Sequence, residues 1–196
     1  MPVTTITRKP RADRTRNREL LLLAAAEVFR SGGAQASLEA VAKRAELGIG
    51  TLYRHFPTRE ALFEAVYRRE IEQLADLAEE LCASREPPLE ALRQWLHANI
   101  RMVATKKGML SALALAVDSS SELYAYSSRR LTTAADSLLK HAISAGAVRE
   151  DISAEDLVHT VIGLCLTRNL PGSEDAVIRL LDVFVEGLSV RNSAST

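Results

Sequence analysis

The chain has 196 residues, of which 47% are hydrophobic and 26% are charged, a composition typical of a globular protein. The formal net charge is zero, but residues 1–70 hold thirteen lysines and arginines against eight acidic residues, and the remainder has the opposite excess. This asymmetry indicates a nucleic-acid or membrane contact at the basic end, unless it is a chance excess of surface arginines.

No apolar run is long enough to cross a membrane. Residues 20–26 follow a basic start, but the run is short and Glu27 interrupts it at once, which argues against a signal peptide. Cys82 and Cys165 lie in apolar helical patterns and are expected to be buried thiols of a reducing compartment, not a disulfide. We therefore expect a cytoplasmic protein with no membrane partner.

The N-terminal quarter of the chain predicts an arm and three helices. Residues 1–14 contain two prolines and no apolar period, so we expect a flexible basic arm, which either reaches along DNA or is a solvated tail. A first helix is predicted over residues 15–31 and ends at two glycines. Ser37 is a suitable N-cap for a second helix over 38–45, and a short third helix over 49–55 ends before Pro57.

The rest of the chain predicts only helices. A long helix follows Thr58 to about residue 82, and others are expected over 89–105, 109–117, 122–145 and 174–190. Ser153 and Asp156 form a capping-box-like start for one more, which ends before residue 171. No segment shows convincing strand periodicity, so the expected fold is all-α, with about nine helices.

Residues 38–56 have the pattern of a helix-turn-helix. Such a unit needs apolar residues that lock two short helices together, here Val41 and Leu52, and a small residue at their closest approach, here Ala42. The second helix would enter the major groove of DNA. Short helical pairs also occur in enzymes as plain packing, so the pattern alone leaves both interpretations open.

The start of the third helix is suited to a close approach to DNA. Gly48 and Gly50 would let its positively polarised end come near a phosphate or a base edge. Thr51 offers a hydroxyl and a methyl group, and Arg54 can reach either a phosphate or a guanine.

Neighbouring side chains support the same interpretation. Tyr53 and His55 can donate hydrogen bonds to phosphates, although the Tyr53 ring could also pack partly in the core. Arg59, in the first turn of the next helix, could clamp the flanking DNA backbone. Phe56 is expected to be a core residue.

The stretch LLLAAAEVFRSGGAQASLEAVAKRAELGIGTLYRHFPTREAL, residues 21–62, resembles the DNA-binding domain of TetR-family transcriptional repressors, and GTLYRHFPTREAL is its most specific portion. The resemblance implies DNA-backbone contacts by Ser37, Thr51, Tyr53, His55 and Arg59. It places Gly48, Ile49, Gly50 and Arg54 on or near the surface that reads the bases. Glu46 departs from the family, which usually has glycine there, so the turn is expected to be strained or differently shaped.

The last two helices carry apolar stripes that either form a dimer interface or are buried within one subunit. The resemblance favours a four-helix bundle built by two subunits. The predicted interface residues are Val161, Leu164, Cys165, Val177, Leu181, Phe184 and Leu188.

The middle helices are expected to enclose a largely apolar effector pocket with a few polar anchors. Each candidate taken alone is more often a core residue than a ligand contact. Arg168 could meet an anionic effector or pair with an acidic neighbour across the dimer. The candidates are Trp95, Met102, Met109, Leu113, Tyr124, Leu131 and Arg168.

The sequence offers no positive case for catalysis, a metal or a cofactor, because its histidines and cysteines lack ligand spacing and no phosphate-binding or nucleophile motif occurs. The leading interpretation is a homodimeric repressor that binds a palindromic double-stranded DNA operator and is released by a small-molecule effector. Its DNA-binding domain would span residues 15–57, and its effector-binding and dimerisation domain residues 58–196. The alternatives are a helical small-molecule binding protein without a DNA-binding role and an enzyme with a site in the middle helices.

Overall fold

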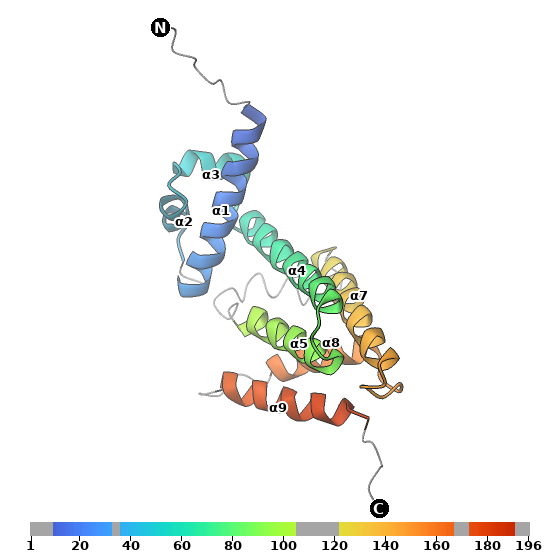
Figure 1. Ribbon diagram of the computed structural model, residues 1–196. Helices are drawn as coiled ribbons and strands as arrows, with labels where there is room; N and C mark the ends of the chain where they lie inside the picture. The colour runs from blue at the N-terminus through green and yellow to red at the C-terminus, as the bar shows by residue number, and fades with distance from the viewer. Residues whose placement is uncertain (1–9, 33–35, 105–121, 167–172, 191–196) are drawn as a thin grey trace, which may run out of the picture. The chain divides into compact units, whose positions relative to one another are not determined.

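The computed structural model describes residues 10–32, 36–104, 122–166 and 173–190, and every regular element within these ranges is a helix (Figure 1). The all-α prediction is confirmed, and the helix predicted over 109–117 lies outside the described residues. The helices are α1 (Pro10–Gly32), α2 (Leu38–Arg44), α3 (Ile49–His55), α4 (Arg59–Ala83), α5 (Pro88–Ala104), α7 (Glu122–Ser144), α8 (Ala154–Leu166) and α9 (Ser173–Leu188). None of the described helices is long and apolar enough to span a membrane.

Helix α1 begins at Pro10, so the prediction of a flexible arm through residue 14 was wrong for its last residues. Proline is favoured at the first helical position because its missing N–H would have no partner there. Asp13 adds a negative charge to the first turn, where the helix dipole favours one. Residues 1–9 of the predicted arm lie outside the described residues.

Side-chain caps fix the starts of three helices, as the sequence predicted. Ser37 Oγ and Thr58 Oγ1 each accept a hydrogen bond, at 3.1 Å, from the N–H of the third residue of α2 and of α4. At α8, the N–H of Asp156 donates to Ser153 Oγ at 3.2 Å, and the N–H of Ser153 donates to Asp156 Oδ2 at 2.9 Å. These bonds satisfy N–H groups that have no partner within their own helix.

The described residues 10–32 and 36–67 belong to one compact unit, which contains α1, α2, α3 and the first part of α4. The rings of Phe29 in α1 and Phe63 in α4 lie 6.0 Å apart between centroids. The Arg44 Nη2 atom of α2 lies 2.7 Å from the Glu27 carboxylate of α1. The core of this unit holds Leu21, Ala25, Phe29, Val41, Leu52 and Leu62.

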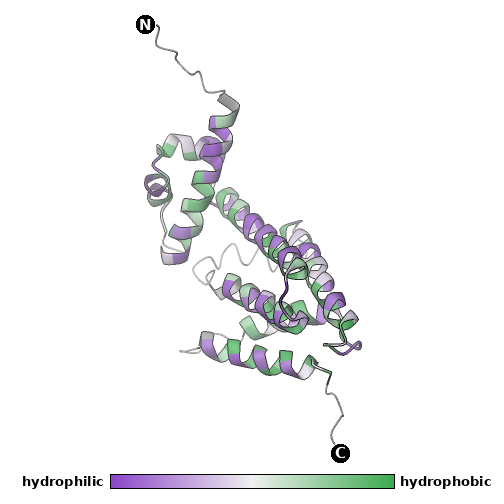
Figure 2. Cartoon of the chain, viewed as in Figure 1, coloured by the Kyte–Doolittle hydropathy of each residue, from purple (hydrophilic) through white to green (hydrophobic). Residues whose placement is uncertain are grey.

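The described residues 68–104, 122–166 and 173–190 form the second compact unit, made by the rest of α4 with α5, α7, α8 and α9. The helices bear alternating hydrophilic and hydrophobic stripes (Figure 2). Helix α5 packs against α7, α8 and α9 and contributes the largest buried side chain, Trp95, whose Nε1–H donates to the Leu74 carbonyl at 2.8 Å. The other fully buried residues include Leu92, Leu96, Ile100, Leu138 and Leu157.

Polar contacts hold α9 against its neighbours near its middle and just beyond its C-terminal end. Asp182 Oδ1 lies 3.0 Å from Arg93 Nη1 and 2.8 Å from His97 Nε2, both on α5. Just beyond α9, an isolated antiparallel bridge pairs Ser189 with Val148 of the α7–α8 connection. Helix α9 is therefore fixed on its inner side.

Candidate nucleic-acid interface and effector site

The turn between α2 and α3 has a left-handed residue, Glu46, with a φ of 56°. The N–H of Glu46 donates to the Lys43 carbonyl at 3.1 Å, and the N–H of Leu47 donates to the Ala42 carbonyl at 2.9 Å. These two bonds define a Schellman motif, which satisfies the last carbonyls of α2. The conformation costs a residue with a side chain about 1 kcal/mol relative to glycine, so the strain expected at Glu46 is present.

Helix α3 directs little of its surface into the core. Leu52 is its only buried residue and has no exposed area, and Phe56, which follows the helix, is 3% exposed as the core prediction required. The N-cap, Gly48, makes no side-chain hydrogen bond. A Cβ added to Gly48 or Gly50 would meet nothing within 4 Å, so the space beside these residues is open.

The other α3 side chains are accessible to solvent. Ile49 is 37% exposed and Tyr53 is 46% exposed, so part of each side chain is available for contact. Arg54 is exposed, and its position on the helical wheel is opposite the buried side. Thr51 and His55 are half-buried on the flank of the helix. The reading surface that the sequence predicted is therefore accessible.

Basic residues of α1 lie near the end of α3. The Arg18 guanidinium lies 5.3 Å from the centroid of the Phe56 ring. Burial, and then the positive charges of Arg14 and Arg18, lower the pKa of His55 below its usual value. This shift favours neutral His55 at pH 7, and a nearby phosphate would favour its protonated form.

Arg59 makes contacts within its own unit. Its Nη1 atom donates a hydrogen bond to the Ala36 carbonyl, and its guanidinium lies 5.4 Å from the centroid of the Phe29 ring. Ala36 immediately precedes Ser37, the exposed N-cap of α2. Arg59 therefore positions the start of α2, and its contact with the DNA backbone stays a prediction.

The described residues of the predicted effector pocket lie on α5 and α7, which pack against each other. Trp95 is fully buried with its N–H satisfied, and Leu131 is 7% exposed. Met102 and Tyr124 are half-buried. The other predicted lining residues, which lie outside the described residues, are Met109, Leu113 and Arg168.

Asn99 was not among the predicted site residues, and it shares one face of α5 with Trp95 and Met102. Its side chain is 2% exposed, and its Nδ2 group has no hydrogen-bond partner among the residues that the structure describes. Ser127, the other buried polar residue among those described, donates to the Leu123 carbonyl at 2.8 Å. A buried donor without a partner costs roughly 1–3 kcal/mol, so a ligand acceptor there would relieve a real penalty. The sequence signal that could have identified Asn99 is its spacing of four residues from Trp95, which places both on one face of a helix.

The predicted dimer residues are mostly inside the single chain. Val161, Val177, Leu181 and Leu188 are all at most 3% exposed. Leu164, Cys165 and Phe184 are half-buried.

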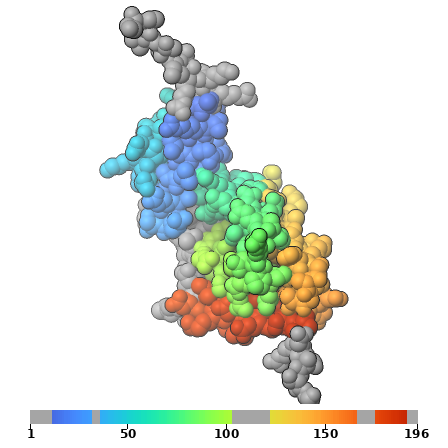
Figure 3. Space-filling model, in the orientation of Figure 1, coloured from blue at the N-terminus to red at the C-terminus, as the bar shows by residue number. Residues whose placement is uncertain are grey.

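Other residues of the same two helices form the exposed apolar surface. Leu180 and Val183 of α9 are 53% and 68% exposed, and Ile162 of α8 is 38% exposed. Gly187 follows on the Leu180–Val183 side of α9, with nothing within 4 Å of an added Cβ. Figure 3 shows that other described parts of the second unit leave α9 uncovered along its outer side.

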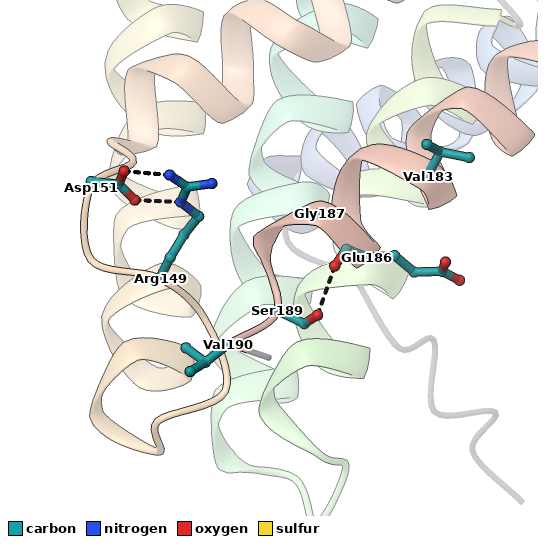
Figure 4. A pocket seen from close by; sticks show the side chains of 7 residues that line it. All are labelled: Arg149, Asp151, Val183, Glu186, Gly187, Ser189 and Val190. Atoms are coloured by element: carbon teal, nitrogen blue, oxygen red, sulfur yellow. Dashed lines mark hydrogen bonds and ion pairs between the residues drawn. The ribbon is translucent and has the colours of Figure 1, made fainter. Parts of the chain in front are cut away.

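An open groove lies at the end of α9 (Figure 4). An ion pair between Arg149 and Asp151 borders it, and Ser189 Oγ donates to the Glu186 carbonyl at 2.7 Å. Its polar, open character differs from that of an enclosed effector pocket. The groove is lined by Arg149, Asp151, Val183, Glu186, Gly187, Ser189 and Val190, so it shares two residues with the outer side of α9.

Known proteins resemble both units. Residues 21–66 match the family model of bacterial regulatory proteins of the tetR family, and residues 87–190 match that of the C-terminal domain of SbtR-like transcriptional regulators. The crystal structure of a TetR transcriptional regulator from Streptomyces coelicolor is 40% identical, with a TM-score of 0.76, over 89% of this chain and 99% of that one. A TetR transcription regulatory protein from Mycobacterium vanbaalenii is 31% identical, with a TM-score of 0.68, over 92% and 99%.

Proposed function

Because the chain belongs to the TetR family of transcriptional regulators, which join a DNA-binding N-terminal domain to a ligand-binding C-terminal domain, we propose that it is a homodimeric repressor. It binds a palindromic operator and is released by a small-molecule effector. The DNA-binding domain contains α1, α2 and α3, residues 10–57, and the helices that follow bind the effector and the second subunit.

The observation that carries this proposal is the outward surface of α3. The helix is anchored by Leu52 and leaves Arg54 and Tyr53 exposed on a short segment that follows a tight turn. A helix of this kind fits the major groove, where Arg54 can pair with a guanine. The proposed DNA contacts are Ser37, Gly48, Ile49, Gly50, Thr51, Tyr53, Arg54, His55 and Arg59.

A second subunit is needed because α3 has only seven residues and reaches few base pairs. A symmetric dimer supplies a second reading helix, and the operator then mirrors its two-fold symmetry. The exposed apolar side chains of Leu180, Val183 and Ile162 support pairing through the outer side of α8 and α9. Val183→Asp should then shift the protein from dimer to monomer in sedimentation, whereas Lys140→Asp, at an exposed site on α7, should leave the dimer intact.

The effector site lies between α5 and α7, and Asn99 is its polar anchor. The unpaired Nδ2 group favours an effector with a hydrogen-bond acceptor in a mostly apolar body. Asn99→Leu should raise the stability of the free protein, because it removes a buried unpaired group, and should abolish effector-induced release from DNA. Loss of stability with an unchanged effector response would contradict the anchor role.

Release requires that the effector and DNA favour different forms of the protein, so each weakens the binding of the other. Helix α4 has residues in both units. Its Glu72 accepts hydrogen bonds from Arg130 Nε, at 3.1 Å, and from Tyr126 of α7. Arg130 and then Tyr126 lower the pKa of Glu72, which keeps it ionised. This link joins α4 to the helix that bears Tyr124 and Leu131.

A mobility-shift titration with the DNA upstream of the chain's own gene tests the proposal. We expect saturable binding that exceeds binding to an unrelated duplex of equal length. The logarithm of the association constant should fall with the logarithm of salt concentration by about 0.9 for each phosphate neutralised. Equal binding to both duplexes together with a flat salt response would favour the alternative, a helical small-molecule binding protein without a DNA-binding role.

A further inference from the structure

We propose that Ile49 is a specificity residue that contacts the C5-methyl group of a thymine in each operator half-site. The inference rests on the proposed DNA-binding function and names part of the sequence that this function requires. It follows from the side chains present on α3, their exposure and the groups that a major groove offers.

Ile49 and its two neighbours in the chain lack hydrogen-bonding side chains. Gly48 and Gly50 have no side chain, and Ile49 is aliphatic. A recognition helix contacts base edges mainly through its first residues. Side-chain hydrogen bonds cannot distinguish bases at this position, so an apolar contact is the remaining direct readout. The thymine methyl group is the apolar group that base pairs present in the major groove.

The surroundings of Ile49 are open enough for that contact. Ile49 is 37% exposed, whereas Leu52 and Phe56 fill the core beneath α3 with at most 3% exposure. An added Cβ on either flanking glycine would meet nothing within 4 Å, so the space beside these two glycines is open. Tyr53, one turn later, is 46% exposed on the same side of the helix and extends this apolar strip.

Thr51 is the alternative residue for the thymine contact, because its side chain also has a methyl group. It is half-buried on the opposite flank of α3, and its hydroxyl suits a phosphate. Thr51→Ser removes its methyl group and keeps the hydroxyl. This variant therefore separates the two residues experimentally, and Ile49→Ala removes most of the proposed contact from a site outside the core.

The test uses the full-length protein and a duplex that it selects from a random DNA pool. Each thymine of the selected duplex is replaced in turn by uracil, which lacks only the C5-methyl group, and the dissociation constant is measured. At one thymine position in each half-site, we expect the replacement by uracil to weaken wild-type binding by about fourfold, which corresponds to the burial of one methyl group. Ile49→Ala should bind the thymine and uracil duplexes equally, whereas Thr51→Ser should keep the fourfold ratio.

Three results would overturn the inference. The wild type could bind every uracil duplex as tightly as the parent, Ile49→Ala could keep the thymine preference, or Thr51→Ser could lose it. Thermal melting of both variants checks that each is folded. Failure to enrich any duplex would instead reject the proposed DNA-binding function, so the two failures are distinguishable.

Discussion

Helices α2 and α3 are neighbours of equal length, with seven residues each, but they are stabilised differently. Helix α2 has a side-chain cap from Ser37, an acidic residue in its first turn and three buried residues. Helix α3 starts at a glycine without a side-chain cap, has no acidic residue in its first turn and buries one residue. Helix α3, which carries the surface proposed to meet DNA, therefore lacks the side-chain cap and the acidic first-turn residue that stabilise α2. Helix α2 packs against α3 and supports it.

The largest expected effect comes from removing the single buried anchor of α3. Leu52→Ala should lower the free energy of unfolding by about 2–5 kcal/mol, because Leu52 is fully buried and no second α3 residue replaces it. Val41→Ala in α2 removes less apolar volume and leaves Leu38 and Ala42 in place, so its effect should be smaller. Urea denaturation of both variants measures the difference, and equal losses would break the contrast between the helices.

The turn between the two helices should be easier to stabilise than either helix. Glu46→Gly is expected to raise the free energy of unfolding by about 1 kcal/mol, because glycine adopts the left-handed conformation without the side-chain penalty. Glu46→Gln is the matched control, since it removes the charge but keeps the strain. A gain in Glu46→Gln equal to that in Glu46→Gly would assign the effect to charge instead of backbone conformation.

A side-chain cap added to α3 tests whether a more stable helix start weakens the contact of α3 with DNA. Gly48→Ser should raise stability by a few tenths of a kcal/mol, because serine caps a helix slightly better than glycine does. It should weaken operator binding, since the new side chain occupies the space now open beside Gly48. Thermal melting and a DNA titration measure the two quantities, and tighter DNA binding by the capped variant would contradict this account of the glycine.

The smallest expected effect is a pH dependence from His55. Its pKa is already lowered in the free protein by burial and by Arg14 and Arg18, so acidification below its usual pKa of about 6.5 should slightly destabilise the free fold. A DNA phosphate raises the same pKa, so operator affinity should increase over that range. His55→Gln should flatten the His55 part of both trends, and an unchanged affinity profile in this variant would exclude His55 as the titrating contact.

The sequence predicted helix caps and helix bounds more accurately than it predicted which side chains are buried and which are exposed. The caps at Ser37, Thr58 and Ser153 and the bounds of α3 were confirmed because neighbouring residues determine them. The start of α1 was predicted too late because residues 1–14 contain two prolines and show no apolar period, although proline is also a favoured first residue of a helix.

Burial within one chain was harder to predict, because an apolar stripe does not say which partner covers it. Leu181 is fully buried within the single chain, while Val183, two residues away, is 68% exposed. Asn99 was missed for a related reason, since only the packing of α5 shows that its amide is buried and unpaired. The residues proposed to contact DNA stay predictions that follow from the resemblance and from their exposure.

The most direct test of the central claim, that α3 reads an operator, is the effect of Arg54→Ala on specific and non-specific binding. Arg54 is exposed opposite the buried side of α3, and a bidentate pair with guanine is worth roughly 1–3 kcal/mol in each half-site. We expect the variant to lose far more affinity for the selected operator than for an unrelated duplex at the same salt concentration. An equal loss on both duplexes would contradict base reading by Arg54 and leave it as a phosphate contact.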